Sequence, residues 1–180
     1  MMKKVKIAVY VLRILMILLC IVSASFIVYN SIQTGETSTQ QSHKAVDTVQ
    51  EVAKVVAPDS KIATATGEEY EQLHSDIRQL AHFSEFAVFG FSAFGCCLSF
   101  TLKKKILVYP SLFVVLFSVL DEYLQTFTAG RAGQAIDVLM DVMGALSGGM
   151  FALIMASILI FLYKKKEKGH GARELGDSLN

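Results

Sequence analysis

Hydrophobic and polar residues occupy this chain in long blocks. Four apolar runs stand between polar segments, at Ile7–Tyr29, Phe86–Leu102, Ile106–Leu120 and Val142–Tyr163. The first and last runs are long enough for a helix to cross a hydrocarbon layer of about 30 Å, which takes roughly 20 residues. The pattern predicts an all-α integral membrane protein with four transmembrane helices.

Lysines mark one end of each run and predict the orientation. They precede the first run, separate the second from the third, and follow the fourth, as Lys3, Lys4 and Lys6, Lys103–Lys105, and Lys164–Lys166. Because lysine-rich ends stay in the cytoplasm, the N- and C-termini are predicted to be cytoplasmic, with 30–81 and about 124–137 outside. A cleaved signal peptide would explain the first run less well, because its apolar core spans only about 7–15 residues.

The chain therefore divides into four predicted parts. Residues 1–29 form a cytoplasmic N-terminus with the first transmembrane helix, and residues 30–81 an extracytoplasmic loop. A core with three transmembrane helices occupies 82–163, and a disordered cytoplasmic tail occupies 164–180.

The predicted outer loop carries helical patterns of its own. Apolar residues recur at helical spacing from His43 to Val56, Pro58–Ser60 then break the pattern, and a second stretch runs from Glu69 to Leu80. We expect short amphipathic helices that lie on the membrane surface or cover the bundle. A plain cap over the helix ends and a lid over a binding site both fit this pattern.

Composition agrees with the membrane class. The chain is 53% hydrophobic and 18% charged, and its net charge of +1 gives no basic face of the kind that binds nucleic acid. Cys20, Cys96 and Cys97 all lie in apolar runs, which favours packing roles over disulfides or metal ligands. Gly144 and Gly148 form a Gly-x-x-x-Gly pair, typical of closely packed membrane helices.

The third run is too short to span the bilayer by itself. Ile106–Leu120 covers roughly 22 Å at 1.5 Å per residue, so its helix must continue through Asp121 and Glu122 to about Gln125. Each ionised acid costs about 2.5–3.5 kcal/mol at the bilayer centre and less near the interface. That cost makes the two acids candidates for a functional site.

Polar residues cluster at the predicted outer ends of the second, third and fourth apolar runs, so they are expected to lie at one level of the membrane. They are Arg78, His82, Glu85, Asp121, Glu122, Gln125, Arg131, Asp137 and Asp141. The acids outnumber the two arginines, so some must be protonated, face water or bind a cation. Oxygen ligands with one imidazole suit Mg²⁺, Mn²⁺ or Zn²⁺. A network of arginines and carboxylates that only pins the helices is the simpler interpretation.

The order of these motifs resembles the VanZ-like family of bacterial membrane proteins over about residues 26–150. The matching features are Asp121-Glu122-Tyr-Leu-Gln125, Gly130-Arg131, Asp137 and Asp141 before Gly144 and Gly148, and Ala81-His82-Phe83-Ser84-Glu85-Phe86. Asn30–Ser38 resembles a Ser-rich segment of one branch, with Asn30 in place of its usual Ser. The resemblance implies a role at the cell envelope, since founding members confer resistance to the glycopeptide antibiotic teicoplanin. It does not supply a reaction.

Two hypotheses follow for the function. In the first, an outer-face polar pocket engages a lipid-linked or cell-wall substrate. If it is catalytic, His82 acts as acid/base with Glu85 or Asp121, and Arg78, Gln125 and Arg131 bind the substrate. Glu122, Asp137 and Asp141 then position a cation or the helices. In the second, the protein is non-catalytic and binds an antibiotic or lipid, or supports another membrane protein. Transport fits four short spans less well.

Overall fold

The computed structural model describes the backbone of residues 2–177 and the side chains of residues 6–103 and 105–166. Its elements are α1 (Met2–Ser31), α2 (Gly35–Val56), α3 (Lys61–Thr64), α4 (Glu68–Phe100), the 3₁₀ helix η1 (Lys104–Leu107), α5 (Val108–Gln125) and α6 (Ala135–Asp177). Four of the helices, α1, α4, α5 and α6, are long and apolar enough to cross a membrane. The predicted all-α architecture with four transmembrane helices is confirmed, while the side on which the termini lie stays a prediction.

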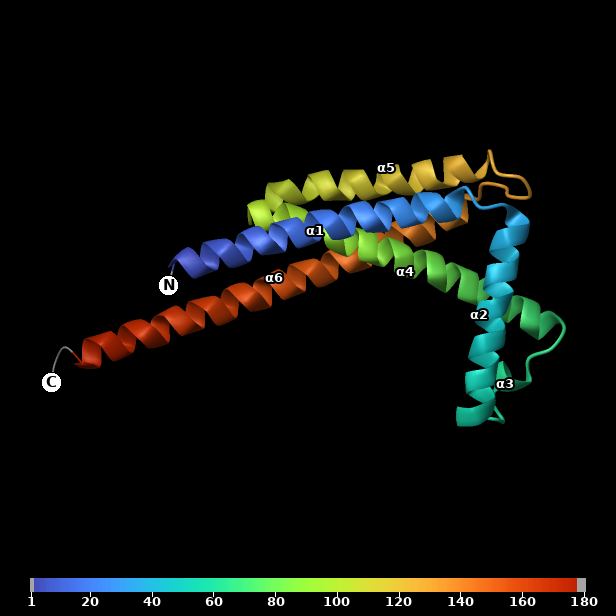
Figure 1. The fold of residues 1–180 in the computed structure, drawn as a ribbon, viewed down its shortest axis with the longest axis horizontal. Helices are drawn as coiled ribbons and strands as arrows, with labels where there is room; N and C mark the ends of the chain where they lie inside the picture. The colour runs from blue at the N-terminus through green and yellow to red at the C-terminus, as the bar shows by residue number, and fades with distance from the viewer. Residues whose placement is uncertain (1, 178–180) are drawn as a thin grey trace.

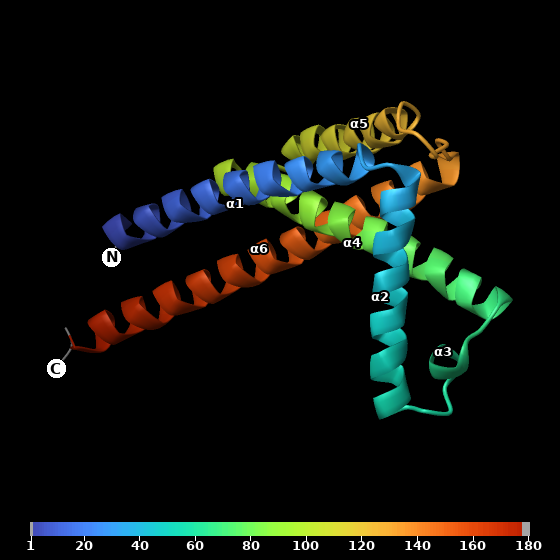
Figure 2. The same ribbon diagram turned by 45° about the vertical axis from the view of Figure 1, so that its right-hand side comes forward.

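The four long helices form one elongated bundle, and α2 runs across one end of it (Figures 1 and 2). We call this end, where α1, α5 and their loops meet α2, the polar end. Both chain termini lie toward the opposite end (Figure 1). The lysines of residues 103–105, between α4 and α5, and of residues 164–166, in the last part of α6, also lie at the end of the bundle away from α2. The separation of lysines from the polar end matches the pattern seen in the sequence.

Close packing of α4 on α6 holds the bundle together. This is the most extensive contact between any two described elements. Gly144 and Gly148 of α6 lie directly against backbone carbonyls of α4, and Gly90 of α4 lies against the carbonyl of Ala145. A side chain at any of these glycines would overlap the neighbouring backbone. Small residues on both helices thus allow the close approach that the Gly-x-x-x-Gly pair predicts.

A small aromatic cluster fills the space between α1, α4 and α5. Phe86 and Phe89 are fully buried and meet edge-to-face, with ring centroids 6.2 Å apart, and Phe117 of α5 lies 4.5 Å from Phe89. Ile27 of α1 and Val114 of α5 complete the packing. The outward faces of α1, α5 and α6 are covered instead with exposed apolar side chains. Such a surface is stable in lipid, where no hydrophobic penalty opposes it.

The segment between α1 and α4 is more helical than its sequence pattern indicated. α2 begins at Gly35 rather than near His43, because Thr34 caps it: its Oγ1 accepts a hydrogen bond of 3.2 Å from the Thr37 amide. The predicted stretch from Glu69 to Leu80 is the first part of α4, which continues without a break into the second span. Helix α6 likewise continues through Asp177, into the segment 164–180 for which disorder was predicted, and residues 178–180 lie outside the described part.

Candidate functional site

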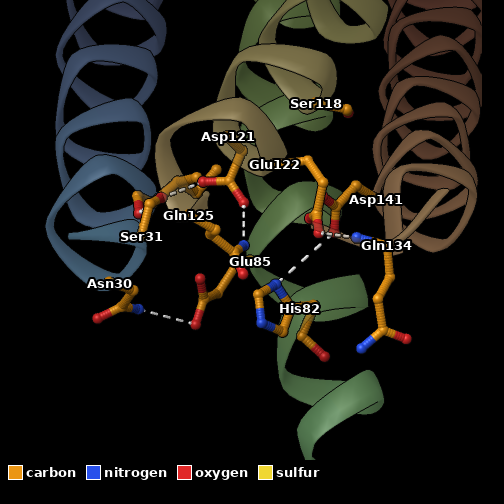
Figure 3. A network of polar contacts seen from close by, with 12 residues as sticks. Asn30, Ser31, His82, Glu85, Ser118, Asp121, Glu122, Gln125, Gln134 and Asp141 are labelled. Atoms are coloured by element: carbon orange, nitrogen blue, oxygen red, sulfur yellow. Dashed lines mark hydrogen bonds and ion pairs between the residues drawn. The ribbon is translucent and has the colours of Figure 1, made fainter. Parts of the chain in front are cut away.

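Six of the polar residues predicted to share one membrane level are drawn together at the polar end in Figure 3: His82, Glu85, Asp121, Glu122, Gln125 and Asp141. The other three, Arg78, Arg131 and Asp137, line a cavity there with His82 and Gln125. Those that are almost completely buried come from α5 and α6: Asp121 is 2% exposed, Glu122 7%, Gln125 6% and Asp141 0%. The half-buried ones are Arg78, His82, Glu85, Arg131 and Asp137. They meet because α4 passes through the level of the bundle at which α5 ends and α6 begins.

Hydrogen bonds join the ends of α1 and α5. Ser31 Oγ donates to Oδ1 of Asp121, and Gln125 Nε2 donates to Oδ2 of the same carboxylate at 2.9 Å (Figure 3). Thr128 Oγ1 donates to the Ser31 carbonyl at 3.2 Å. Asp121 is therefore held from both sides, which fixes its carboxylate in the interior of the bundle.

A second link joins α1 to α4. Asn30 Nδ2 donates a hydrogen bond of 3.0 Å to Oε1 of Glu85 (Figure 3). Asn30 and Ser31 were not among the predicted site residues. Their place in the sequence was the available signal, because both are polar and stand at the end of the first apolar run, level with the other groups.

The loop between α5 and α6 holds Glu122. Oε1 of Glu122 accepts a hydrogen bond from the backbone amide of Gln134, just before α6 begins (Figure 3). The loop turns at Gly130, whose φ of 76° suits glycine. The backbone amide of Gly35 donates a hydrogen bond of 2.9 Å to the carbonyl of Ala129, so the loop is also connected to the start of α2.

Asp141 is the least satisfied group at the polar end. It is fully buried, and neither carboxylate oxygen has a hydrogen-bond partner among the described residues. Its Oδ1 lies 3.8 Å from Nδ1 of His82, across the interface between α6 and α4 (Figure 3). Such a group is costly to bury, and it sets Asp141 apart from the bonded Asp121.

The arginines do not neutralise these acids directly. Within the part of the chain that the structure describes, the contact between His82 and Asp141 is the only one between a basic and an acidic side chain within 4.0 Å. The network of arginines and carboxylates considered from the sequence is therefore not formed at ion-pair distance. Burial lowers the pKa of Arg131 and the nearby Asp121 opposes this, but a guanidinium stays charged in either case.

Two polar cavities flank His82 and the arginines. One, of about 160 Å³, opens between α1, α2 and α4, and the other, of about 260 Å³, lies beside the loop between α5 and α6. Arg78, His82 and Arg131 line both cavities. Glu85 lines the first cavity, and Gln125 and Asp137 line the second. Each cavity is thus lined by two arginines and one acid, whereas the buried acids Asp121, Glu122 and Asp141 are not part of either lining.

An apolar groove reaches the same place from the side of the bundle. It has a volume of about 340 Å³ and runs between α1 and α4, where its walls include Leu19, Val22, Phe26 and Val88. Glu85 lines this groove as well as the first polar cavity. The lateral, apolar surface of the bundle and its polar interior therefore come together at one residue.

Comparison with known proteins supports the resemblance seen in the motifs. The VanZ/LLP1 family model matches residues 15–159, which includes every residue of the polar end named above. No curated protein and no solved structure matches the chain. The match covers most of the sequence, with the second and third spans complete and most of the first and fourth. The chain therefore belongs to the VanZ/LLP1 family.

Proposed function

We propose that this envelope membrane protein binds an amphiphilic, lipid-linked cell-wall precursor, with the anionic headgroup in the polar cavities and the chain in the apolar groove. The polar end then faces the outside of the cytoplasmic membrane. The observation that carries the proposal is the position of Glu85, which lines both the groove and a polar cavity.

The two arginines account for a preference for anions. Arg78 and Arg131 line both cavities and are not paired with any acid within 4.0 Å among the described side chains. A guanidinium presents a planar set of donors that matches phosphate or carboxylate oxygens. Two unpaired arginines facing one space favour a phosphorylated or carboxylated headgroup over a neutral one.

The apolar groove accounts for a lipid-linked ligand rather than a free one. A water-soluble phosphate would gain nothing from a groove walled by Leu19, Val22 and Val88, which opens between α1 and α4 toward the side of the bundle. An isoprenoid or acyl chain gains contact with these residues while its headgroup reaches the two arginines of the first polar cavity, which meets the groove at Glu85. If the bound substrate also reacts, His82 is the group placed to exchange a proton with it, because it borders both cavities.

Binding of a polyprenyl phosphate to the purified protein tests the proposal. We expect native mass spectrometry to detect one bound polyprenyl phosphate, and the corresponding polyprenol without phosphate to bind at least tenfold more weakly. Arg131→Gln should weaken binding to a similar extent, because it removes a charge-assisted hydrogen-bond donor worth about 1.5–3 kcal/mol. Equal binding of the phosphate and the alcohol would contradict the anionic headgroup.

Two control variants separate the headgroup from the chain. Arg13→Gln removes a half-buried arginine at the opposite end of the bundle, where its Nε donates 3.0 Å to the Ser99 carbonyl, and it should leave binding unchanged. Val88→Trp fills the apolar groove and should weaken binding of the polyprenyl phosphate without affecting inorganic phosphate. Unchanged polyprenyl phosphate binding in Val88→Trp would exclude the groove as the site of the chain.

A link to teicoplanin resistance follows if the bound precursor is one that the antibiotic also recognises. A protein that holds or alters the precursor at the membrane surface limits the antibiotic's access to it. Non-catalytic binding is enough for this effect. Direct binding of the antibiotic is the alternative, and it predicts that teicoplanin itself, rather than a polyprenyl phosphate, stabilises the purified protein.

A further inference from the structure

Asp141 requires a partner that no described side chain supplies. Both of its oxygens are buried and without a hydrogen bond, and the residue has no exposed surface. Protonation would remove the charge but would leave a buried O–H donor that also needs an acceptor. A cation next to the carboxylate would satisfy both the charge and the two bare oxygens.

Two other potential ligands face the same space from neighbouring helices. One ligand atom each from His82 of α4, Asp121 of α5 and Asp141 of α6 lie within 4.8 Å of one another. We propose that His82, Asp121 and Asp141 bind a divalent transition-metal cation, Mn²⁺ or Zn²⁺. The site lies farther inside the bundle than the two polar cavities: His82 lines both cavities, whereas Asp121 and Asp141 are buried and line neither.

The geometry leaves each ligand free to coordinate. Asp121 accepts one hydrogen bond on each oxygen, from Ser31 and Gln125, and each oxygen keeps a further lone pair. These two bonds hold the Asp121 carboxylate in place, as partners of metal ligands commonly do. Ligand atoms bound about 2.0–2.3 Å from a metal are at most about 4.5 Å apart, so small side-chain movements suffice.

A fourth possible ligand lies beside this set. Oε2 of Glu122 is buried and has no hydrogen-bond partner among the described residues, while Oε1 is held by the Gln134 amide. Its carboxylate points toward the region of Asp141 in Figure 3. Two acidic side chains from adjacent helices, each with at least one unpartnered buried oxygen, are easier to explain with a cation than without one, because like charges there would repel.

The ligand types decide which cation is expected. The imidazole nitrogen suits Zn²⁺ and the two carboxylates suit Mn²⁺, whereas Ca²⁺ and Mg²⁺ prefer oxygen ligands only. The absence of thiolate from the set disfavours softer ions. Coordination through Nδ1, the nitrogen that faces Asp141, leaves Nε2–H of His82 as a hydrogen-bond donor. That donor is available to the cavities that His82 borders, so a metal-bound His82 serves there as a hydrogen-bond donor in place of the proton exchange considered above.

Metal binding can be measured without any substrate, so it is tested separately from the proposed function. The protein purified in detergent is stripped with a chelator, dialysed, and titrated with Mn²⁺ while the free ion is followed by electron paramagnetic resonance. We expect one Mn²⁺ per chain and, in pulsed spectra, coupling to one imidazole nitrogen. Zn²⁺ should displace the Mn²⁺. Absence of binding of both ions to the folded wild-type protein would overturn the proposal.

Variants identify the ligands. Asp141→Asn should weaken Mn²⁺ binding at least tenfold, whereas Asp76→Asn, at an exposed position of α4 outside the ligand set, should leave it unchanged. If Asp141→Asn does not fold, His82→Gln serves instead, since it should abolish the imidazole coupling. Equal binding in wild type and Asp141→Asn, or retained coupling in His82→Gln, would place the ion elsewhere and reject this site.

Discussion

Gly148 of α6 lies against the backbone carbonyl of Ala87 in α4, with no room for a side chain between them. This contact sits in the interface that positions Asp141 opposite His82. We expect Gly148→Leu to destabilise the folded protein by about 1–3 kcal/mol or more, because overpacking forces the two backbones apart. Thermal unfolding in detergent, followed by size-exclusion chromatography, measures the effect.

The neighbouring Ser147 provides a matched control for Gly148. Ser147 is exposed on the outward face of α6, and its Oγ donates only to the Met143 carbonyl of its own helix. Ser147→Leu adds similar bulk where lipid or detergent can accept it and should change the unfolding temperature little. Equal loss of stability in the two variants would mean that added bulk anywhere on this turn of α6 is destabilising, and would contradict a specific role for the contact between Gly148 and Ala87.

The hydrogen bond between Asn30 and Glu85 should contribute measurably to the docking of α1 on α4. Asn30 Nδ2 lies 3.0 Å from Oε1 of Glu85, and this hydrogen bond joins the two helices at the polar end. A double-mutant cycle with Asn30→Ala and Glu85→Ala should give a coupling energy of about 0.5–1.5 kcal/mol in chemical unfolding. A coupling energy near zero would show that water replaces the bond without loss.

The sequence located the polar end but not the roles of its members. Apolar run length predicts the four helices, and the shortness of the third run places Asp121 and Glu122 inside the membrane region, because both follow from the thickness of a bilayer. Asp137 and Asp141 are equivalent by spacing, yet only Asp141 is fully buried. That difference depends on how α6 crosses α4, which a pattern within one helix does not contain.

The hydrogen bonds that the first helix makes to α4 and α5 could not be predicted from the spacing of residues in the sequence either. Asn30 and Ser31 reach Glu85 and Asp121 across 55 and 90 residues of chain. Contacts between distant segments depend on the rotation of each helix about its axis. Polar residues at the end of an apolar run therefore indicate the membrane level of a contact and leave the partner open.

Gln50 should control how firmly α2 holds the segment before α4. Its Nε2 donates to the carbonyls of Ile62 and Ala65, at 3.1 and 3.0 Å, and the residue is buried. Gln50→Leu leaves both carbonyls without this donor, at a cost of about 1–3 kcal/mol for the buried Ala65 carbonyl and less for the partly buried Ile62 carbonyl. We expect faster amide hydrogen exchange in residues 57–67, and no such change in Gln40→Leu, because Gln40 is exposed.

Any resistance conferred by the chain should depend on the polar end. We expect expression to raise the minimum inhibitory concentration of teicoplanin in a susceptible host, and Arg131→Ala and Asp121→Asn to abolish this at unchanged protein level. Arg13→Gln, at the opposite end of the bundle, should retain it. Full resistance in both polar-end variants would exclude the pocket as its cause. Resistance retained in His82→Asn would favour binding over proton-transfer catalysis.

The lysines predict the orientation of the bundle in the membrane, and this orientation can be measured directly. Ala129, in the loop between α5 and α6, and Lys103, before α5, are both exposed and lie at opposite ends of the third span. With Cys20, Cys96 and Cys97 replaced by alanine, single cysteines at these two positions are treated in intact cells with a membrane-impermeant maleimide. The positive-inside rule predicts labelling at Ala129→Cys and, only after permeabilisation, at Lys103→Cys. The reverse pattern would place the polar end in the cytoplasm, and an external cell-wall precursor could then no longer be its ligand.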